Sequence, residues 1–194
     1  MRIQPLRRAH WPSIAAGVLA GGVIGWTAQE LPYVNWRTLE APVDEMPLMI
    51  RQDAKGDGRF GAPRSGHRTH RGIDLAAPLG SPVRAARSGV VVTTGTHRGL
   101  GRYVELEHRG GLHSLYAHLQ TIEVDVGRRV RQGDRLGTVG KTGNARSRLI
   151  TPHVHFEMVK DGQPVDPSTM GLAAAPPASA DAVAEPVGNA DGGE

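Results

Sequence analysis

Histidines at widely separated positions of a glycine-rich, β-patterned stretch constrain this chain more than any other feature. The stretch runs from His70 to Glu157. A His-x-Gly-Ile-Asp motif opens it at 70–74, a His-x-His motif closes it at 153–155, and His118 lies between them. Side chains this far apart in sequence meet only where a fold packs several strands together, so the fold and any shared site must be considered jointly.

The spacing of apolar residues predicts β-strands and no long helix. Short apolar alternations are separated by Gly and Asn or Asp turns, and no segment shows a sustained 3.6-residue period. The expected strands lie at 73–76, 82–86, 89–94, 102–108, 112–117, 135–139 and 153–160. With 194 residues, 26 of them Gly and 14 Pro, the chain suits one turn-rich domain with tails. The predicted fold class is all-β, a two-layer antiparallel sandwich or an open barrel with a long groove.

The N-terminal segment, residues 1–28, is typical of a signal anchor or a signal peptide. Three arginines precede an uncharged run of 18 residues from Trp11 to Ala28. A run of this length is close to the minimum for a helix that spans a bilayer. We favour an uncleaved anchor, because cleavage before Gln29 would place Trp26 where a small residue is required.

The charges that flank this run predict its orientation. Arginines before it and Glu30 after it keep the N-terminus in the cytoplasm by the positive-inside rule. The expected location is therefore the inner membrane, with one N-terminal membrane helix and the rest of the chain in the periplasm. Two alternatives stay open: secretion after cleavage, for which the bond after Gly25 is a candidate, and a buried core helix.

The remaining chain divides into three parts. Residues 29–56 contain three prolines and are expected to form a linker or stalk, with a first short strand at 47–50. Residues 57–170 hold the β pattern and form the domain. Residues 171–194 are rich in Ala, Pro, Gly and acidic residues, which predicts a disordered tail because too little apolar surface is available to order it.

The domain is basic although the chain as a whole is nearly balanced. Residues 51–170 carry nineteen Lys and Arg against eleven Asp and Glu. This charge suits a polyanionic partner such as phospholipid, an anionic cell wall or nucleic acid, and it equally suits simple solubility. The absence of cysteine excludes disulfides, thiol nucleophiles and Cys-type zinc sites.

Two motifs supply ligands of the kind that zinc prefers. On a strand, His153 and His155 point to the same face while Val154 points to the other. A strand end that turns at Gly72 brings together the first histidine and the aspartate of the 70–74 motif, and both residue types bind zinc. Taken singly, each pair also fits a purely structural role.

The combination of these motifs favours a catalytic metal site. Two imidazoles and one carboxylate make three ligands, which leaves the fourth tetrahedral position open for water and substrate, as in catalytic rather than structural zinc sites. Two further histidines then remain for proton transfer or oxyanion stabilisation. Zinc with a neutral histidine beside it is suited to amide hydrolysis.

The ordered set of motifs resembles the lysostaphin-type, or LytM-domain, zinc metallopeptidases across residues 57–167. The resemblance rests on Asp-Gly-Arg-Phe-Gly-Ala-Pro-Arg at 57–64, His-x-Gly-Ile-Asp-Leu-Ala-Ala-Pro at 70–78, Gly-Val-Val-Val at 89–92, Tyr-Ala-His-Leu at 116–119, Val-x-x-Gly-Asp-x-Leu-Gly at 130–137, Thr-Gly-Asn-Ala at 142–145 and Pro-His-Val-His-Phe-Glu at 152–157. It implies that His70, Asp74 and His155 bind one Zn²⁺ per chain and that His118 and His153 form the catalytic pair.

The same resemblance implies a function, with alternatives. The family cuts peptide bonds in peptidoglycan, so we expect a zinc endopeptidase that acts on peptidoglycan cross-links, and no nucleic acid partner. One alternative is a catalytically silent regulator that binds cell wall or activates another hydrolase. Another is a zinc peptidase for protein substrates outside the cell wall. Residues 146–151 are longer than the usual link in the family and leave substrate preference open.

The expected groove runs between the His70 turn and two loops, 95–101 and 143–151. Four arginines near these loops are candidates for contact with substrate carboxylates: Arg98, Arg102, Arg146 and Arg148.

Overall fold

The computed structural model describes residue 35 and residues 39–175, which belong to the compact unit Tyr33–Glu194. The segment expected to form an N-terminal membrane helix lies outside these residues, as do positions 176–194 of the expected disordered tail. Within the described residues, no helix is both long and apolar enough to cross a bilayer.

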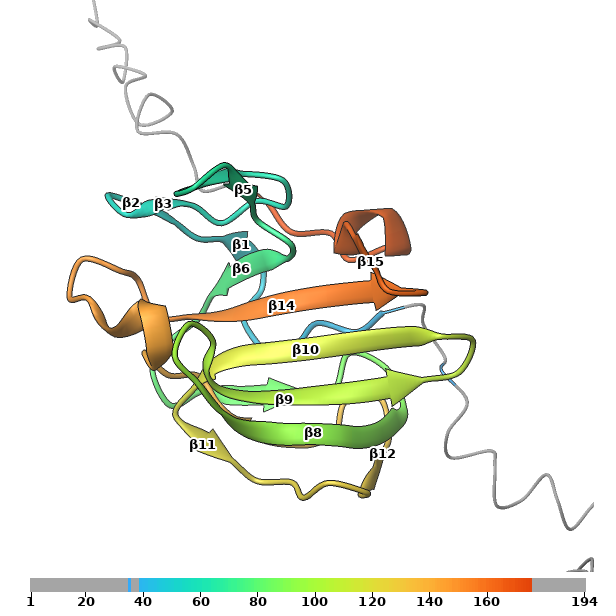
Figure 1. The fold of residues 1–194 in the computed structure, drawn as a ribbon. Coiled ribbons are helices and arrows are strands. Elements are labelled where there is room, and N and C mark those ends of the chain that lie inside the picture. Colours follow the sequence, from blue (N-terminus) through green and yellow to red (C-terminus); the bar gives the residue numbers. More distant parts are fainter. Residues whose placement is uncertain (1–34, 36–38, 176–194) are drawn as a thin grey trace, which may run out of the picture. The chain divides into compact units, whose positions relative to one another are not determined.

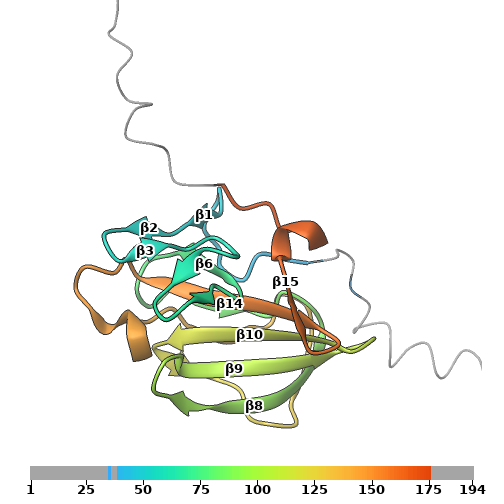
Figure 2. The ribbon, with the colours of Figure 1, turned by 45° about the horizontal axis from the view of Figure 1, so that its top comes forward.

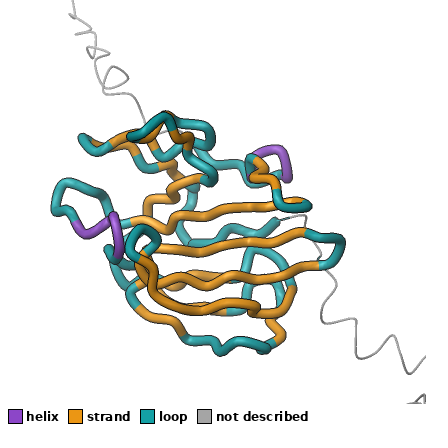
Figure 3. Tube along the Cα trace, in the orientation of Figure 1, coloured by secondary structure: helices purple, strands orange, loops and turns teal. Residues whose placement is uncertain are grey.

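Strands dominate the described chain, and its helices are two short 3₁₀ turns, η2 (Gly143–Arg146) and η3 (Pro167–Met170) (Figure 3). The strands are β1 (Met49–Ile50), β2 (Gln52–Asp53), β3 (Gly56–Asp57), β4 (Pro63–Arg64), β5 (Arg68–Thr69), β6 (Ile73–Ala76), β7 (Pro82–Arg84), β8 (Gly89–His97), β9 (Gly101–His108), β10 (Leu112–Leu119), β11 (Thr121–Ile122), β12 (Arg129–Val130), β13 (Arg135–Thr138), β14 (His153–Lys160) and β15 (Gln163–Val165). The prediction of a mostly β chain is confirmed for these residues, and each of the seven predicted strands matches an observed one within a few residues.

The strands build one large antiparallel sheet and several smaller ones. Eight strands form the large sheet in the order β1-β6-β14-β10-β9-β8-β12, with β15 paired to β14 at one end (Figure 1). A second sheet has the order β11-β13-β7, and β2–β3 and β4–β5 form two separate hairpins. None of the described sheets closes into a barrel. Figure 2 shows the β2–β3 hairpin above β6, which contains the end of the first histidine motif, and β14, which contains the last one.

Alternation along the strands places the apolar core between the two sheets. Phe156 of β14, Tyr116 of β10 and Val104 of β9 belong to the same buried cluster as Val83 of β7 and Leu136 of β13. All five are fully buried, so each removes most of its apolar surface from water. The opposite face of the large sheet is thereby left for polar side chains.

The described part of the segment predicted as a linker, 39–56, packs on the domain. Leu39, Val43 and Leu48 are buried in the core cluster, and β1 pairs with β6. Leu172, from the start of the predicted tail, is also buried there. These residues lie among prolines and short polar runs, so no periodic pattern signals their burial.

A buried polar chain crosses the core side of β10. The backbone N–H of Ala86 donates to Tyr116 Oη at 2.8 Å, Ser114 Oγ lies 3.0 Å from Tyr116 Oη, and His108 Nε2 lies 2.7 Å from Ser114 Oγ. His108 Nδ1 lies 2.9 Å from the Ser88 carbonyl, which can only accept, so this nitrogen carries the proton. Neutral His108 therefore completes a fully satisfied chain.

His108 makes folding stability depend on pH. Burial of the ring lowers the pKa of His108 from the ordinary value of 6.5 to about 4, although its bond to Ser88 acts in the opposite direction. Between these values the unfolded chain binds a proton that the folded chain does not. We therefore expect acidification through this window to cost about 3 kcal/mol of unfolding free energy from this ring alone.

Urea denaturation of wild type and His108→Gln at about pH 7 and about pH 5 measures this effect. The variant should be less stable at the higher pH and should lose less stability on acidification. An equal loss in both proteins would show that His108 is not responsible.

Candidate metal centre

The first motif is folded so that its histidine and aspartate meet. His70 precedes β6 and Asp74 lies within it, and His70 Nε2 is 3.1 Å from Asp74 Oδ1. Gly72 permits this turn to lie against β14, because a Cβ at this position would be 2.2 Å from the Phe156 carbonyl oxygen. The expected turn at Gly72 is therefore observed, and its cause is a close approach of two backbones.

The second motif lies on β14, with its imidazoles on one face. His153 and His155 line the groove, while Val154 and Phe156 are fully buried in the core. In the β6–β14 ladder, His155 pairs directly with Asp74. The register of two antiparallel strands thus places ligands from the two motifs opposite each other.

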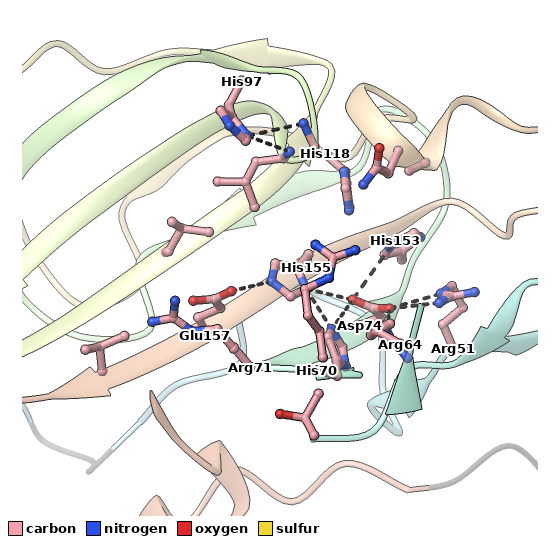
Figure 4. Close-up of a pocket in the computed structure, with 18 of the residues that line it drawn as sticks. Arg51, Arg64, His70, Arg71, Asp74, His97, His118, His153, His155 and Glu157 are labelled. Atoms are coloured by element: carbon pink, nitrogen blue, oxygen red, sulfur yellow. Dashed lines mark hydrogen bonds and ion pairs between the residues drawn. The ribbon is translucent and has the colours of Figure 1, made fainter. Parts of the chain in front are cut away.

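Three potential ligand atoms converge in one small space (Figure 4). His155 Nδ1 lies 2.8 Å from Asp74 Oδ1 and 2.9 Å from His70 Nε2. Tetrahedral zinc with bonds of ~2.0–2.2 Å separates its ligands by about 3.3 Å. A shift of a few tenths of an ångström would therefore let these three atoms hold one zinc ion.

The outer contacts of both imidazoles orient these atoms inwards. His70 Nδ1 is 2.8 Å from the Arg59 carbonyl, and His155 Nε2 is 2.9 Å from Glu157 Oε1. Both partners accept, so these nitrogens carry protons and the other nitrogens face Asp74. The lone pairs of the two inward-facing nitrogens and of the Asp74 carboxylate would repel one another at these distances. A second proton or a metal ion between them removes this repulsion. Metal-bound histidines commonly have such outer partners.

The charges around this set also favour a cation. Burial lowers the pKa of His155, but the carboxylates of Asp74 and Glu157 outweigh it and raise this pKa to about 9. Burial would raise the pKa of Asp74, yet hydrogen bonds with His155 and His70 hold it well below its usual range. The donor set therefore fits a divalent metal ion in chemistry as well as in position.

His118 reaches the same groove by a route that strand alternation does not predict. A regular strand would place it on the same face as Tyr116, which lies in the core. The β9–β10 register instead shifts between Tyr116 and Leu119, and His118 has a left-handed backbone with φ 64°. This bulge turns the imidazole into the groove, and backbone strain of this kind is common at functional sites. His118 therefore does not share the face of Tyr116, as a regular strand would require.

His118 and His153 face each other beside the three converging atoms. Their ring centroids are 4.9 Å apart, and that of His118 is 5.9 Å from that of His155. Each Nδ1 donates to a backbone carbonyl, from His118 to Thr142 at 2.9 Å and from His153 to Thr151 at 2.7 Å. Burial lowers the pKa of His118 to about 3 and also lowers the pKa of His153. Both rings are neutral near pH 7, with Nε2 free to accept a proton.

The five predicted site residues thus line one groove, whose cavity volume is about 1230 Å³. The expected loops border it through His97, Gly99 and Ile150. The four arginines expected to meet substrate are absent from its described lining, and Arg102 donates to the Gln120 carbonyl instead. Its Lys and Arg residues come from the position just before β2, the β2–β3 and β4–β5 hairpins and the His70 turn: Arg51, Lys55, Arg64, Arg68 and Arg71.

The described residues thus combine a mostly β fold with a buried His-Asp-His set, two neutral histidines and an open groove. Residues 68–167 match the model of Peptidase family M23, which is more than half of the chain. The chain belongs to this family, which confirms the resemblance to lysostaphin-type and LytM-domain proteins.

The chain is similar in sequence to two curated relatives. The protein "DD-carboxypeptidase/endopeptidase Mpg" of Neisseria meningitidis serogroup B is 44% identical over 105 residues, which cover 54% of this chain and 23% of that protein. The "Lipoprotein NlpD/LppB homolog" of Pseudomonas aeruginosa is 39% identical over 111 residues, 57% of this chain and 35% of that protein. The matched region thus spans only about a quarter to a third of the length of these relatives.

Solved structures share the fold. A zinc-containing peptidase from Vibrio cholerae superposes with a TM-score of 0.56 and 30% identity, over 75% of this chain and 41% of that one. The catalytic domain of the antimicrobial peptidase lysostaphin from Staphylococcus simulans has a TM-score of 0.51 and 31% identity, over 60% of this chain and 90% of that one.

Proposed function

We propose that the protein is a zinc-dependent endopeptidase that hydrolyses peptide bonds in peptidoglycan. The observation that carries this proposal is the convergence of His70 Nε2, Asp74 Oδ1 and His155 Nδ1 beside two neutral histidines in an open groove. Membership of the family supports peptide-bond hydrolysis. The substrate class is supported by similarity to the protein named "Peptidoglycan DD-endopeptidase ShyA" of Vibrio cholerae, which is 40% identical over 97 residues, 50% of this chain and 22% of that protein. We also propose that the N-terminal segment anchors the chain in the inner membrane, with the site in the periplasm.

The three converging residues would hold the zinc ion, which supplies a Lewis acid for the scissile carbonyl. A neutral His118 or His153 accepts a proton at Nε2 from the attacking water and returns it to the leaving amine. The Thr142 and Thr151 carbonyls fix the tautomers that make this possible. Burial of both rings keeps them unprotonated until the proton transfer itself.

Digestion of purified peptidoglycan tests this function. The full-length protein loaded with zinc should release new peptide-containing fragments, and chelation should stop their release. Fragment masses then identify the bond that is cut. A zinc-loaded protein that binds the polymer without producing fragments would contradict the proposal and favour the regulatory alternative.

A further inference from the structure

One guanidinium holds the oxygen of Asp74 that faces away from the imidazoles. Arg51 donates to Asp74 Oδ2 through Nη2 at 2.9 Å and Nε at 3.3 Å, while Asp74 Oδ1 faces His155. In Figure 4, Arg51 and His155 lie on either side of Asp74. Arg51 is only 6% exposed, so little water competes for this contact. Arg64 also approaches Asp74 Oδ2, at the longer distance of 3.5 Å.

Arg51 continues into a second carboxylate that reaches the His-x-His strand. Its Nη1 forms an ion pair with Asp53 Oδ1 at 2.8 Å, although this contact lacks hydrogen-bond alignment. Asp53 Oδ2 accepts the backbone N–H of Thr151 at 2.9 Å. The carbonyl of that same Thr151 accepts from His153 Nδ1 at 2.7 Å. A continuous polar chain therefore runs from Asp74 through Arg51 and Asp53 to His153.

The backbone around Arg51 is tied to the same place. The Arg51 N–H donates to the Asp74 carbonyl at 2.8 Å, and the Gly58 N–H donates to the Arg51 carbonyl at 2.8 Å. The side chain of Arg51 therefore starts from a fixed position beside Asp74. Both Arg51 and Asp53 lie before residue 68, outside the part of the chain that matches the family model.

We propose that Arg51 and Asp53 form a positioning pair, which fixes the carboxylate of Asp74 for zinc and the ring of His153 for proton transfer. Arg51 occupies Oδ2 and so presents Oδ1 to the metal, and Asp53 holds Thr151 at the end of the long 146–151 loop. Partners of this outer kind orient metal ligands, and their loss lowers metal affinity by roughly 10–100-fold. The inference rests on the proposed zinc site but not on peptide hydrolysis.

Zinc affinity of the full-length protein, measured by competition with a chromophoric chelator, tests this pair. Arg51→Met should weaken zinc binding by roughly 10–100-fold, because Asp74 loses its aligned cation. Arg51→Lys should recover part of the affinity, since an ammonium supplies the charge but not the planar fork. Asp53→Leu should also weaken zinc binding, and the double variant should lose less than the sum of both effects, because both residues belong to one chain of contacts.

The matched control is Arg84→Met. Arg84 also joins the segment before the domain to a strand, through Asp44 at 2.6 Å, but it does not line the groove. The zinc affinity of Arg84→Met should equal that of wild type. This control separates the loss of positioning contacts at Asp74 from a general loosening of the segment before the domain. The visible spectrum of Co²⁺-loaded protein should change in Arg51→Met and not in Arg84→Met, because only the former alters ligand geometry.

Folded Arg51→Met with wild-type zinc affinity and a wild-type cobalt spectrum would overturn the inference while leaving the zinc site intact. If Arg51→Met does not fold, Arg51→Lys and Asp53→Leu decide in its place: unchanged affinity in both overturns the inference. A wild-type protein that binds no zinc would overturn the proposed function and, with it, this role of Arg51.

Discussion

Replacing His155 with alanine is expected to abolish zinc binding, and hydrolysis with it. The change removes one of three converging ligand atoms and leaves Asp74 and Glu157 as neighbouring carboxylates without the imidazole between them. Loss of a direct ligand should exceed the roughly 10–100-fold effect of losing an outer partner. Metal analysis after dialysis measures zinc per chain, and the peptidoglycan assay measures turnover.

His113→Ala serves as the control for metal content. This histidine also lines the groove, but its ring contacts Glu105 at 3.1 Å and none of the three converging residues. It should retain one zinc per chain. Full zinc content in folded His155→Ala would mean that the metal is held elsewhere, and the assignment of the three ligands would be wrong.

Replacing His118 with alanine should separate metal binding from catalysis. His118 contributes no atom to the converging set, so zinc content should stay at the wild-type level. Turnover should fall by roughly 10²–10⁴-fold, the usual contribution of a positioned general acid or base. Because the residue adopts a left-handed backbone, His118→Asn is a useful second variant: Asn tolerates this conformation better than Ala but accepts protons poorly.

Single-turnover rates with zinc-loaded protein check this prediction, since they report the chemical step without product release. Comparable loss in His118→Ala and His118→Asn would assign the effect to the imidazole and not to a change in the bulge. Normal cleavage by the asparagine variant would show that another group transfers the proton.

Much of the fold could be predicted because its strands have one apolar and one polar face. The alternation in β14 places His153 and His155 on one side and Phe156 on the other, and this follows from strand geometry alone. This alternation is local, and local geometry suffices to predict it. Gly72 indicates a turn before β6, but the reason that glycine is needed there is a close approach to Phe156 of the distant strand β14.

The remaining features depend on contacts between distant segments. The bulge at His118 is set by the register between β9 and β10, and no residue pattern within β10 predicts it. Arg51 lies in a stretch without periodicity, and its partner Asp74 is 23 residues away. Glu157 could have been assigned to the site from the sequence, because the same alternation that aligns the two histidines places its carboxylate beside them.

The direct pairing of Asp74 with His155 links assembly of the site to folding. If β6 slipped by one residue along β14, Asp74 would point into the apolar interior and a different residue would face His155. A chain in that misaligned state could not grip zinc, so the metal would stabilise only the correctly aligned one. Zinc would then select the correct strand alignment during folding, before any substrate is bound.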